Sequence, residues 1–302
     1  MSPSPNAGQT AKRRRPPLLR EAVQSKFVIV SWGLTLAALA AAYWPALGFW
    51  WSRWFESESY YSHGPFVPLA SVFVIWFNRN SLAALPVKPS KLGYAIVLPA
   101  ALAGWIAWMG ASASVMGFTL PLFLFGAIVA TLGWQLACGL AFPVFFLYFT
   151  AVLPEAVLTA VSFKVQMLSI SLATAGLRAV HVSATHTGAY ITMSDLTVEV
   201  GSACSGFRLV VSMLAVAAFF AYIRQGPKWG KAALVAGALP LSIIANSLRI
   251  MLVSLVGREW GTSALRTAHD MTGYVLLVLT VGLLLIFARI VGCAKYKQMP
   301  SA

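Results

Sequence analysis

Eight long runs of apolar residues alternate with short polar stretches along the chain. A helix that crosses a bilayer needs about 20 mostly apolar residues, because its backbone polar groups can bond only within the helix. The runs fall at 27–49, 65–78, 92–111, 115–134, 137–153, 205–223, 232–256 and 271–292. The second run is short and is expected to begin nearer Tyr60. The pattern predicts an all-α polytopic membrane protein with about eight transmembrane helices.

Three stretches between the runs follow other patterns. Residues 50–64 are dense in Trp and Tyr, which is typical of the membrane–water interface. Residues 155–180 are apolar but interrupted by Glu, Lys, Gln and Arg, so they predict a helix that lies on the interface or spans weakly. Residues 185–200 alternate polar and apolar around a Ser-Asp pair, which predicts a small β-hairpin before the sixth run.

The composition agrees with a membrane protein. Of 302 residues, 59% are hydrophobic and 10% are charged, whereas soluble domains carry about 25% charged residues. The net charge of +14 would suggest nucleic acid as a partner of a soluble protein. Here most Lys and Arg residues flank the apolar runs, as topology signals do. We therefore expect contact with membrane lipid and none with nucleic acid.

The basic residues also predict an orientation. They precede the first run, follow the second, separate the sixth from the seventh and follow the last. With eight spans, all these groups lie in the cytoplasm together with both termini. The predicted organisation is a disordered basic tail at 1–26, one membrane domain at 27–292 and a short cytoplasmic tail at 293–302. The first run is too long for a signal-peptide core and is expected to be retained.

No cofactor or metal site is expected. The three cysteines, Cys138, Cys204 and Cys293, are scattered and form neither a disulfide framework nor a metal knuckle. His181 and His186 lack a third ligand nearby in the sequence.

Three reactive residues fall at similar depth on the predicted outer side. Cys204 opens the sixth run, and His269 opens the eighth. Arg249 precedes Gly257 by about seven residues, which corresponds to roughly 10 Å of helix. Because consecutive antiparallel helices usually pack together, the three side chains are expected to converge.

The surroundings of Cys204 suit a nucleophile. A helix start lowers the pKa of a thiol, and so does a nearby cation such as Arg208, one turn further on. Ser205 and Gly206 are small and would let a substrate backbone approach closely. A thiolate at this position could attack a carbonyl and form a thioester.

Arg249 and His269 would complete that chemistry. The arginine could stabilise an oxyanion, and the histidine could protonate a leaving amine. An arginine inside a spanning helix is costly and marks a functional candidate, although it could also pair with Glu199 or Asp270. His63 lies on the same predicted side and could line the site.

Other interpretations stay open at this point. A lone Cys is usually a small core residue, and a His at a helix end is more often a cap than a catalyst. In a transporter, Arg249 and His269 would line a polar path while Cys204 only packs. A membrane enzyme acting on glycans or lipid carriers would also place polar residues at the outer face. The joint occurrence of all three residues favours covalent catalysis.

The sequence resembles the exosortase/archaeosortase family. The matching pieces are ACSGFR at 203–208, NSLR at 246–249, HDMTG at 269–273 and YSHG at 61–64. The resemblance covers roughly residues 27–292. Many family members carry an acidic residue two positions before the Cys, whereas this chain has Ser202.

The resemblance implies a cysteine transpeptidase of the bacterial cytoplasmic membrane with its active site on the outer face. Its substrates would be secreted proteins ending in a Pro-Glu-Pro type motif, a spanning helix and a basic tail. The acceptor would be a cell-surface glycan or lipid. The catalytic residues would be Cys204, Arg249 and His269, with Asn246 and Asp270 as supporting neighbours in the motifs.

Overall fold

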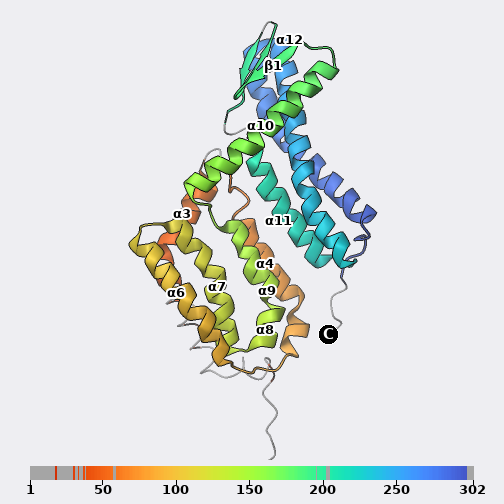
Figure 1. Ribbon diagram of the computed structural model, residues 1–302. Helices are drawn as coiled ribbons and strands as arrows, with labels where there is room; N and C mark the ends of the chain where they lie inside the picture. Colours follow the sequence, from red (N-terminus) through yellow and green to blue (C-terminus); the bar gives the residue numbers. More distant parts are fainter. Residues whose placement is uncertain are drawn as a thin grey trace, which may run out of the picture.

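A computed structural model describes residues 39–56, 59–194, 196–201 and 205–297, together with the separate positions 18, 30, 33 and 37. Side chains at 262, 263, 265–270 and 274 lie outside the described set. The molecule is elongated and contains two groups of helices, with α10 (Glu155–Ala179) running obliquely from the first to the second (Figure 1).

The first group contains the helices that precede α10. They are α3 (Trp44–Phe55), α4 (Phe66–Phe77), α5 (Arg79–Ala83), η1 (Lys91–Gly93), α6 (Tyr94–Met109), α7 (Ala113–Thr131), α8 (Trp134–Gly139), α9 (Ala141–Phe146) and η2 (Leu147–Thr150). Small residues let these helices approach closely, as is usual between membrane helices. A methyl group on Gly117 of α7 would lie 2.6 Å from the indole nitrogen of Trp50.

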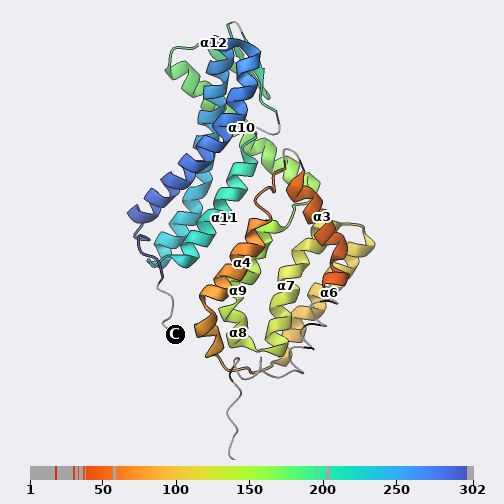
Figure 2. The same cartoon turned by 180° about the vertical axis from the view of Figure 1, so that it is seen from behind.

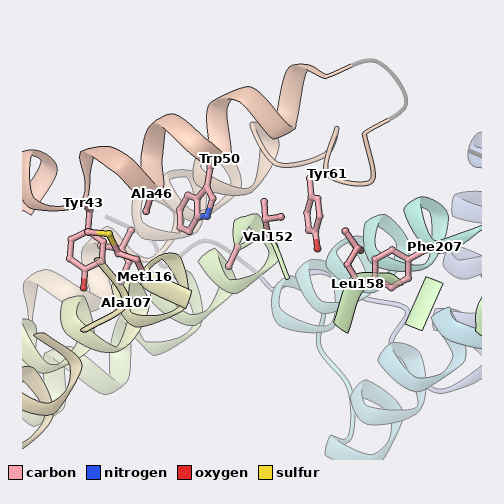
Figure 3. Close-up of a cluster of buried hydrophobic side chains, with 11 residues drawn as sticks. Tyr43, Ala46, Trp50, Tyr61, Ala107, Met116, Val152, Leu158 and Phe207 are labelled. Atoms are coloured by element: carbon pink, nitrogen blue, oxygen red, sulfur yellow. The ribbon is translucent and has the colours of Figure 1, made fainter. Parts of the chain in front are cut away.

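A continuous row of buried apolar side chains joins the two groups. Figure 3 shows it running from Tyr43 through Trp50 and Tyr61 to Phe207, the first residue of α11. The ring of Tyr60 meets Phe207 edge-on, with centroids 5.6 Å apart. The turn between α3 and α4 therefore contacts the beginning of α11.

The second group combines α10, α11 and α12 with a small sheet. Helix α11 covers Phe207–Ile223, and α12 covers Lys228–Ile290. Helix α12 folds back on itself at Gly261, which has φ 80° and ψ −179°, so it forms a hairpin (Figure 2). We call Lys228–Gly261 its first arm and residues 262–290 its second arm. The end of the molecule that carries this turn and the sheet is the sheet end.

The sheet is a three-stranded antiparallel meander of β1 (Ala184–Thr187), β2 (Tyr190–Met193) and β3 (Thr197–Glu199), in the order β1-β2-β3. Its apolar face packs on α10 and on the first arm of α12. The residues in this cluster include Ile170, Leu177, Ile191, Met193, Val198, Val200 and Ile250. Alternation of apolar and polar residues therefore determines which face of the sheet is buried.

The helical and hairpin predictions are confirmed, and the structure adds the third strand. Among the described residues, five segments are long and apolar enough to cross a membrane: Lys91–Met109, Ala113–Thr131, Glu155–Ala179, Lys228–Gly261 and Met271–Ile290. Shorter apolar helices occupy Phe66–Phe77, Ala141–Thr150 and Phe207–Ile223. The predicted count of eight spans is therefore matched only in part. Helix 155–179 has the length and composition of a span.

Several predicted boundaries were wrong. Residues 50–55 belong to α3 because no helix breaker precedes Glu56, where the backbone becomes extended. The seventh helix was expected to end near residue 256, yet it continues to Gly261, the first residue with a non-helical conformation. The fifth run, 137–153, divides into short helices with a turn at Leu140. Most of the first run and the tail at 1–26 lie outside the described residues.

Residues 293–297 return to the end of the molecule opposite the sheet. The side chain of Cys293 is fully buried, and Arg224 Nη1 donates to its carbonyl oxygen at 2.9 Å. Lys297 N donates to the carbonyl of Ile223 at 2.8 Å. Residues 293–297 thus pack against the connection between α11 and α12 rather than extending as a tail.

Candidate active site

The segment after Cys204 meets the first arm of α12. Gly206 precedes α11 with φ 79° and ψ −9°, a left-handed conformation that glycine adopts without strain. A methyl group on Gly206 would lie 2.6 Å from Nδ2 of Asn246. Ser205 and Asn246 are almost completely buried, at 1% and 2% exposure. Two of the predicted motif segments are therefore in direct contact.

Arg249 connects these segments to the third motif. It follows Asn246 by three residues, so both side chains lie on neighbouring parts of one helix face. Its guanidinium lies against Gly273 of the second arm, where an added methyl group would be 3.2 Å from Nη2. Arg249 and Gly273 are each twelve residues from Gly261, about 18 Å along each arm. The hairpin turn thus sets them level with each other.

Arg249 lies further from the hairpin turn than the sequence suggested. The expected depth of roughly 10 Å assumed that the helix ended near Gly257. Since the first arm extends to Gly261, the arginine is about 18 Å from the turn. The sheet packs on this arm between Arg249 and the extension, with Ile250, Met251 and Leu255 in the shared cluster.

Cys204 lies outside the described residues, but the chain is held on both sides of it. Before it, Val200 N donates to the carbonyl of Ala189 at 2.8 Å. Gln166 of α10 donates from Nε2 to the carbonyl of Val200 at 2.6 Å. After it, Ser205 Oγ accepts a bond from Phe207 N at 3.4 Å. The positions of Val200 and Ser205 therefore limit where Cys204 can lie.

His269 and Asp270 belong to the second arm by their backbone, while their side chains lie outside the described set. His269 precedes Gly273 by four residues, which places it about one helical turn nearer the hairpin turn than Arg249. The three motif segments are consequently neighbours, because Gly206 contacts Asn246 and Gly273 contacts Arg249.

Two guanidinium groups are partly shielded from solvent near this contact. Arg208 lies in the first turn of α11, where its Nε and Nη2 atoms are inaccessible to water. Nε of Arg249 is shielded in the same way. Positive charge in a region of low dielectric stabilises an anion strongly. This region can favour a thiolate, an oxyanion or an acidic substrate group.

His63 lies apart from this contact, in the turn between α3 and α4. Its Nε2 is 3.1 Å from the carbonyl of Phe149, and its Nδ1 is 3.2 Å from Ser212 Oγ. Because a carbonyl only accepts, Nε2 carries the proton and Nδ1 accepts from Ser212. Burial lowers the pKa of His63 to about 4, so the ring is neutral at neutral pH. Both nitrogens are occupied, which favours a supporting role over a direct contact with substrate.

Gln166 and Ser169 were not identified as site residues from the sequence. Gln166 anchors the strand that leads to Cys204. One turn further along α10, Ser169 is fully buried, and its hydroxyl has no hydrogen-bond partner among the described residues. The available signal was the presence of polar residues at a spacing of three in an apolar helix. Within the described residues, no three His, Cys, Asp or Glu side chains converge as a metal site would require.

The chain was compared with known proteins. The model of the transmembrane exosortase family matches residues 50–287, which include all four motif segments. The chain belongs to the transmembrane exosortase family. Together with its apolar helices, membership in this exosortase family identifies a multi-pass membrane protein. No curated protein and no solved structure matched the chain.

Proposed function

We propose that this protein is a membrane cysteine transpeptidase that removes the C-terminal sorting tail of secreted proteins and transfers them to a cell-surface acceptor. Membership in the exosortase family supports an enzyme of protein sorting. The observation that carries the proposal is the pair of contacts from Gly206 to Asn246 and from Arg249 to Gly273, which join the three motif segments.

In the first half-reaction, the thiolate of Cys204 attacks the scissile carbonyl carbon. The carbonyl electron pair moves onto oxygen, and the guanidinium of Arg249 stabilises that charge. When the tetrahedral intermediate collapses, the C–N bond breaks and His269 gives a proton to the departing amine. The products are a thioester on Cys204 and the released tail peptide.

In the second half-reaction, an amine or hydroxyl of the acceptor attacks the thioester carbonyl. Neutral His269 accepts the proton that the nucleophile loses, and the thiolate of Cys204 leaves. The secreted protein is then joined covalently to the acceptor, a surface glycan or lipid. The thiolate of Cys204 and the protonated form of His269 are both regenerated, so the enzyme ends in its initial state.

The proposed orientation puts the sheet end on the outer side of the cytoplasmic membrane. The opposite end carries Arg224, Lys228, Lys231, Lys295 and Lys297 at helix ends and in the packed final segment. Positive residues of this kind favour the cytoplasmic side. A substrate tail would enter the bilayer beside the bundle and leave its motif near Cys204.

The test uses a secreted reporter protein fused to a Pro-Glu-Pro type motif, an apolar helix and a basic tail. Cys204→Ala is expected to leave the full-length reporter in the membrane, whereas Cys138→Ala, a matched change at an exposed cysteine, should process it normally. Tail removal at the normal rate by Cys204→Ala would refute the proposal.

Thiol labelling separates the transpeptidase from a transporter. A nucleophilic Cys204 should react with iodoacetamide at pH 6–7 faster than an ordinary thiol, whose pKa is about 8.5. A Cys204 that labels only as fast as Cys138 would favour a packing role.

A further inference from the structure

Strand β3 forms an open edge of the sheet. Thr197, Val198 and Glu199 pair with β2 on one side only. The other edge strand, β1, packs against α10, where Arg178 Nε donates to the carbonyl of Ala184 at 2.7 Å. In the described part of the chain, β3 has no comparable cover on its outer side. An uncovered edge presents backbone groups to a further strand.

The register shows which groups face outward. Met193 N donates to the carbonyl of Leu196, and Val200 N donates to the carbonyl of Ala189, both at 2.8 Å. In an antiparallel ladder, residues alternate between pairs that exchange hydrogen bonds and pairs that do not. The residues that face away from β2 are therefore Thr197 and Glu199.

These outward backbone groups are available for hydrogen bonding. Outside the sheet ladder, no bond among the described residues uses the backbone N–H or C=O of Thr197 or Glu199. Both residues are exposed, while Val198 between them is buried. Together they offer two donors and two acceptors to an extended peptide.

The edge leads directly into the proposed active site. Glu199 precedes Cys204 by five residues, a span of at most about 18 Å even when fully extended. The end of the strand is anchored by the bond from Gln166 to Val200. Val198 and Val200 share a buried cluster with Ile250, the neighbour of Arg249 in sequence.

We propose that an extended segment of the substrate, next to its scissile bond, adds to the edge Thr197–Glu199 as a fourth strand and is thereby directed to Cys204. This inference rests on the proposed transpeptidase function and names how its peptide substrate is held. Main-chain bonds supply affinity in such strand addition and tolerate many side chains. Different secreted proteins can therefore use the same edge.

Proline substitutions test the edge because proline lacks a backbone N–H and is tolerated on outward positions of edge strands. Thr197→Pro and Glu199→Pro each remove one outward donor and leave the backbone bonds to β2 intact. Thr197→Pro also loses the bond from Thr197 Oγ1 to Thr192 Oγ1, and so does Thr197→Val. Each is expected to slow reporter tail removal roughly 3- to 10-fold, the effect of losing one hydrogen bond. The conservative variants Thr197→Val and Glu199→Gln keep the N–H, so each should slow tail removal less than the proline variant at the same position.

Two further measurements distinguish failure of the edge proposal from failure of the transpeptidase function. Iodoacetamide labelling of Cys204 should proceed at the normal rate in both proline variants, which excludes damage to the nucleophile. Cys204→Ala is measured in parallel. Proline variants that process normally while Cys204→Ala does not would overturn the edge proposal alone. Normal processing by Cys204→Ala would overturn the transpeptidase function itself.

Cross-linking tests the same contact without relying on proline. Glu199→Cys is introduced into a protein whose three native cysteines are replaced by alanine, and single cysteines are moved along the reporter's motif and its flanks. Strand pairing predicts disulfide formation at every second reporter position, because side chains alternate between faces. A pattern without this alternation, or cross-linking mainly between two copies of the enzyme, would contradict the proposal.

Discussion

The two groups of helices differ in what they bury. Among the described residues of the first group, the almost fully buried polar side chains are the hydroxyls of Ser59, Ser71, Thr119 and Thr150, and burial also lowers the pKa of His63. The described residues from α10 onward include ten buried polar or charged side chains, among them Ser205, Arg224 and Asn246. This second group also contains the shielded nitrogens of Arg208 and Arg249.

On the proposed function, this difference separates a scaffold from a reactive region. In the first group, the indoles of Trp50 and Trp54 pack closely against Gly117 and Gly64, and their Nε1 atoms are buried. Polar and charged groups inside a membrane protein are expensive, so we expect Arg249 and Asn246 to serve the proposed chemistry. Equivalent substitutions in the two groups should then have different effects on reporter tail removal.

The largest expected effect is at Arg249. Arg249→Ala should lower reporter tail removal about 100-fold or more, since a charge that stabilises an oxyanion is lost. Arg79→Ala removes an exposed guanidinium from the first group, where it lies over Trp76, and should change the rate less than about 2-fold. The rate is measured per folded molecule. A similar rate in both variants would remove the distinction between the two groups.

Two glycines allow a matched steric comparison. An added methyl group would meet a buried side chain at 2.6 Å in both Gly206→Ala and Gly117→Ala. Both variants should lose stability, by about 1–3 kcal/mol for overpacking. Gly206→Ala has an additional penalty of about 1–2 kcal/mol for its left-handed backbone.

Thermal unfolding in detergent measures the stability of these two variants, and reporter processing measures their activity. Only Gly206→Ala should also reduce processing per folded molecule, by at least about 10-fold, because Asn246 and the segment after Cys204 are displaced. Equal specific activity in the two variants would show that the Gly206 contact serves packing alone.

A smaller effect is expected within the second arm. Gly273→Ala brings a methyl group to 3.2 Å from Arg249 Nη2, so the guanidinium must shift by a few tenths of an ångström. Processing should fall several-fold. Gly282→Ala on the same arm meets nothing within 4 Å and should leave processing unchanged. The two rates are compared at equal protein concentration, and identical rates would argue against a functional contact at Gly273.

The smallest expected effect is the pH dependence of stability that His63 causes at the junction between the two groups. The pKa of His63 is lowered from 6.5 to about 4 by burial, so between these values the unfolded chain binds a proton that the folded chain does not. The contribution to stability is therefore complete above pH 6.5 and is lost as pH falls toward 4. Melting temperatures from pH 7.5 to 4.5 should fall less steeply for His63→Gln. Parallel curves would mean that His63 does not titrate in this way.

The sequence alone determined the helical membrane architecture, the hairpin before the sixth run and the family. Apolar runs and strict alternation are local patterns that need no distant partner. The catalytic assignments of Cys204 and His269 remain predictions, because both side chains lie outside the described residues.

Tertiary structure decided the distance of Arg249 from the turn, the third strand and the contacts of Gln166 and His63. Each depends on a contact between residues far apart in the chain, such as the bond from Gln166 to Val200 or from Ser212 to His63. The spacing of apolar residues in the sequence indicates which face of a helix is apolar. It does not indicate which other segment packs on that face. The level at which Gly206, Arg249 and Gly273 meet was set by the turn at Gly261, whose position only the folded hairpin reveals.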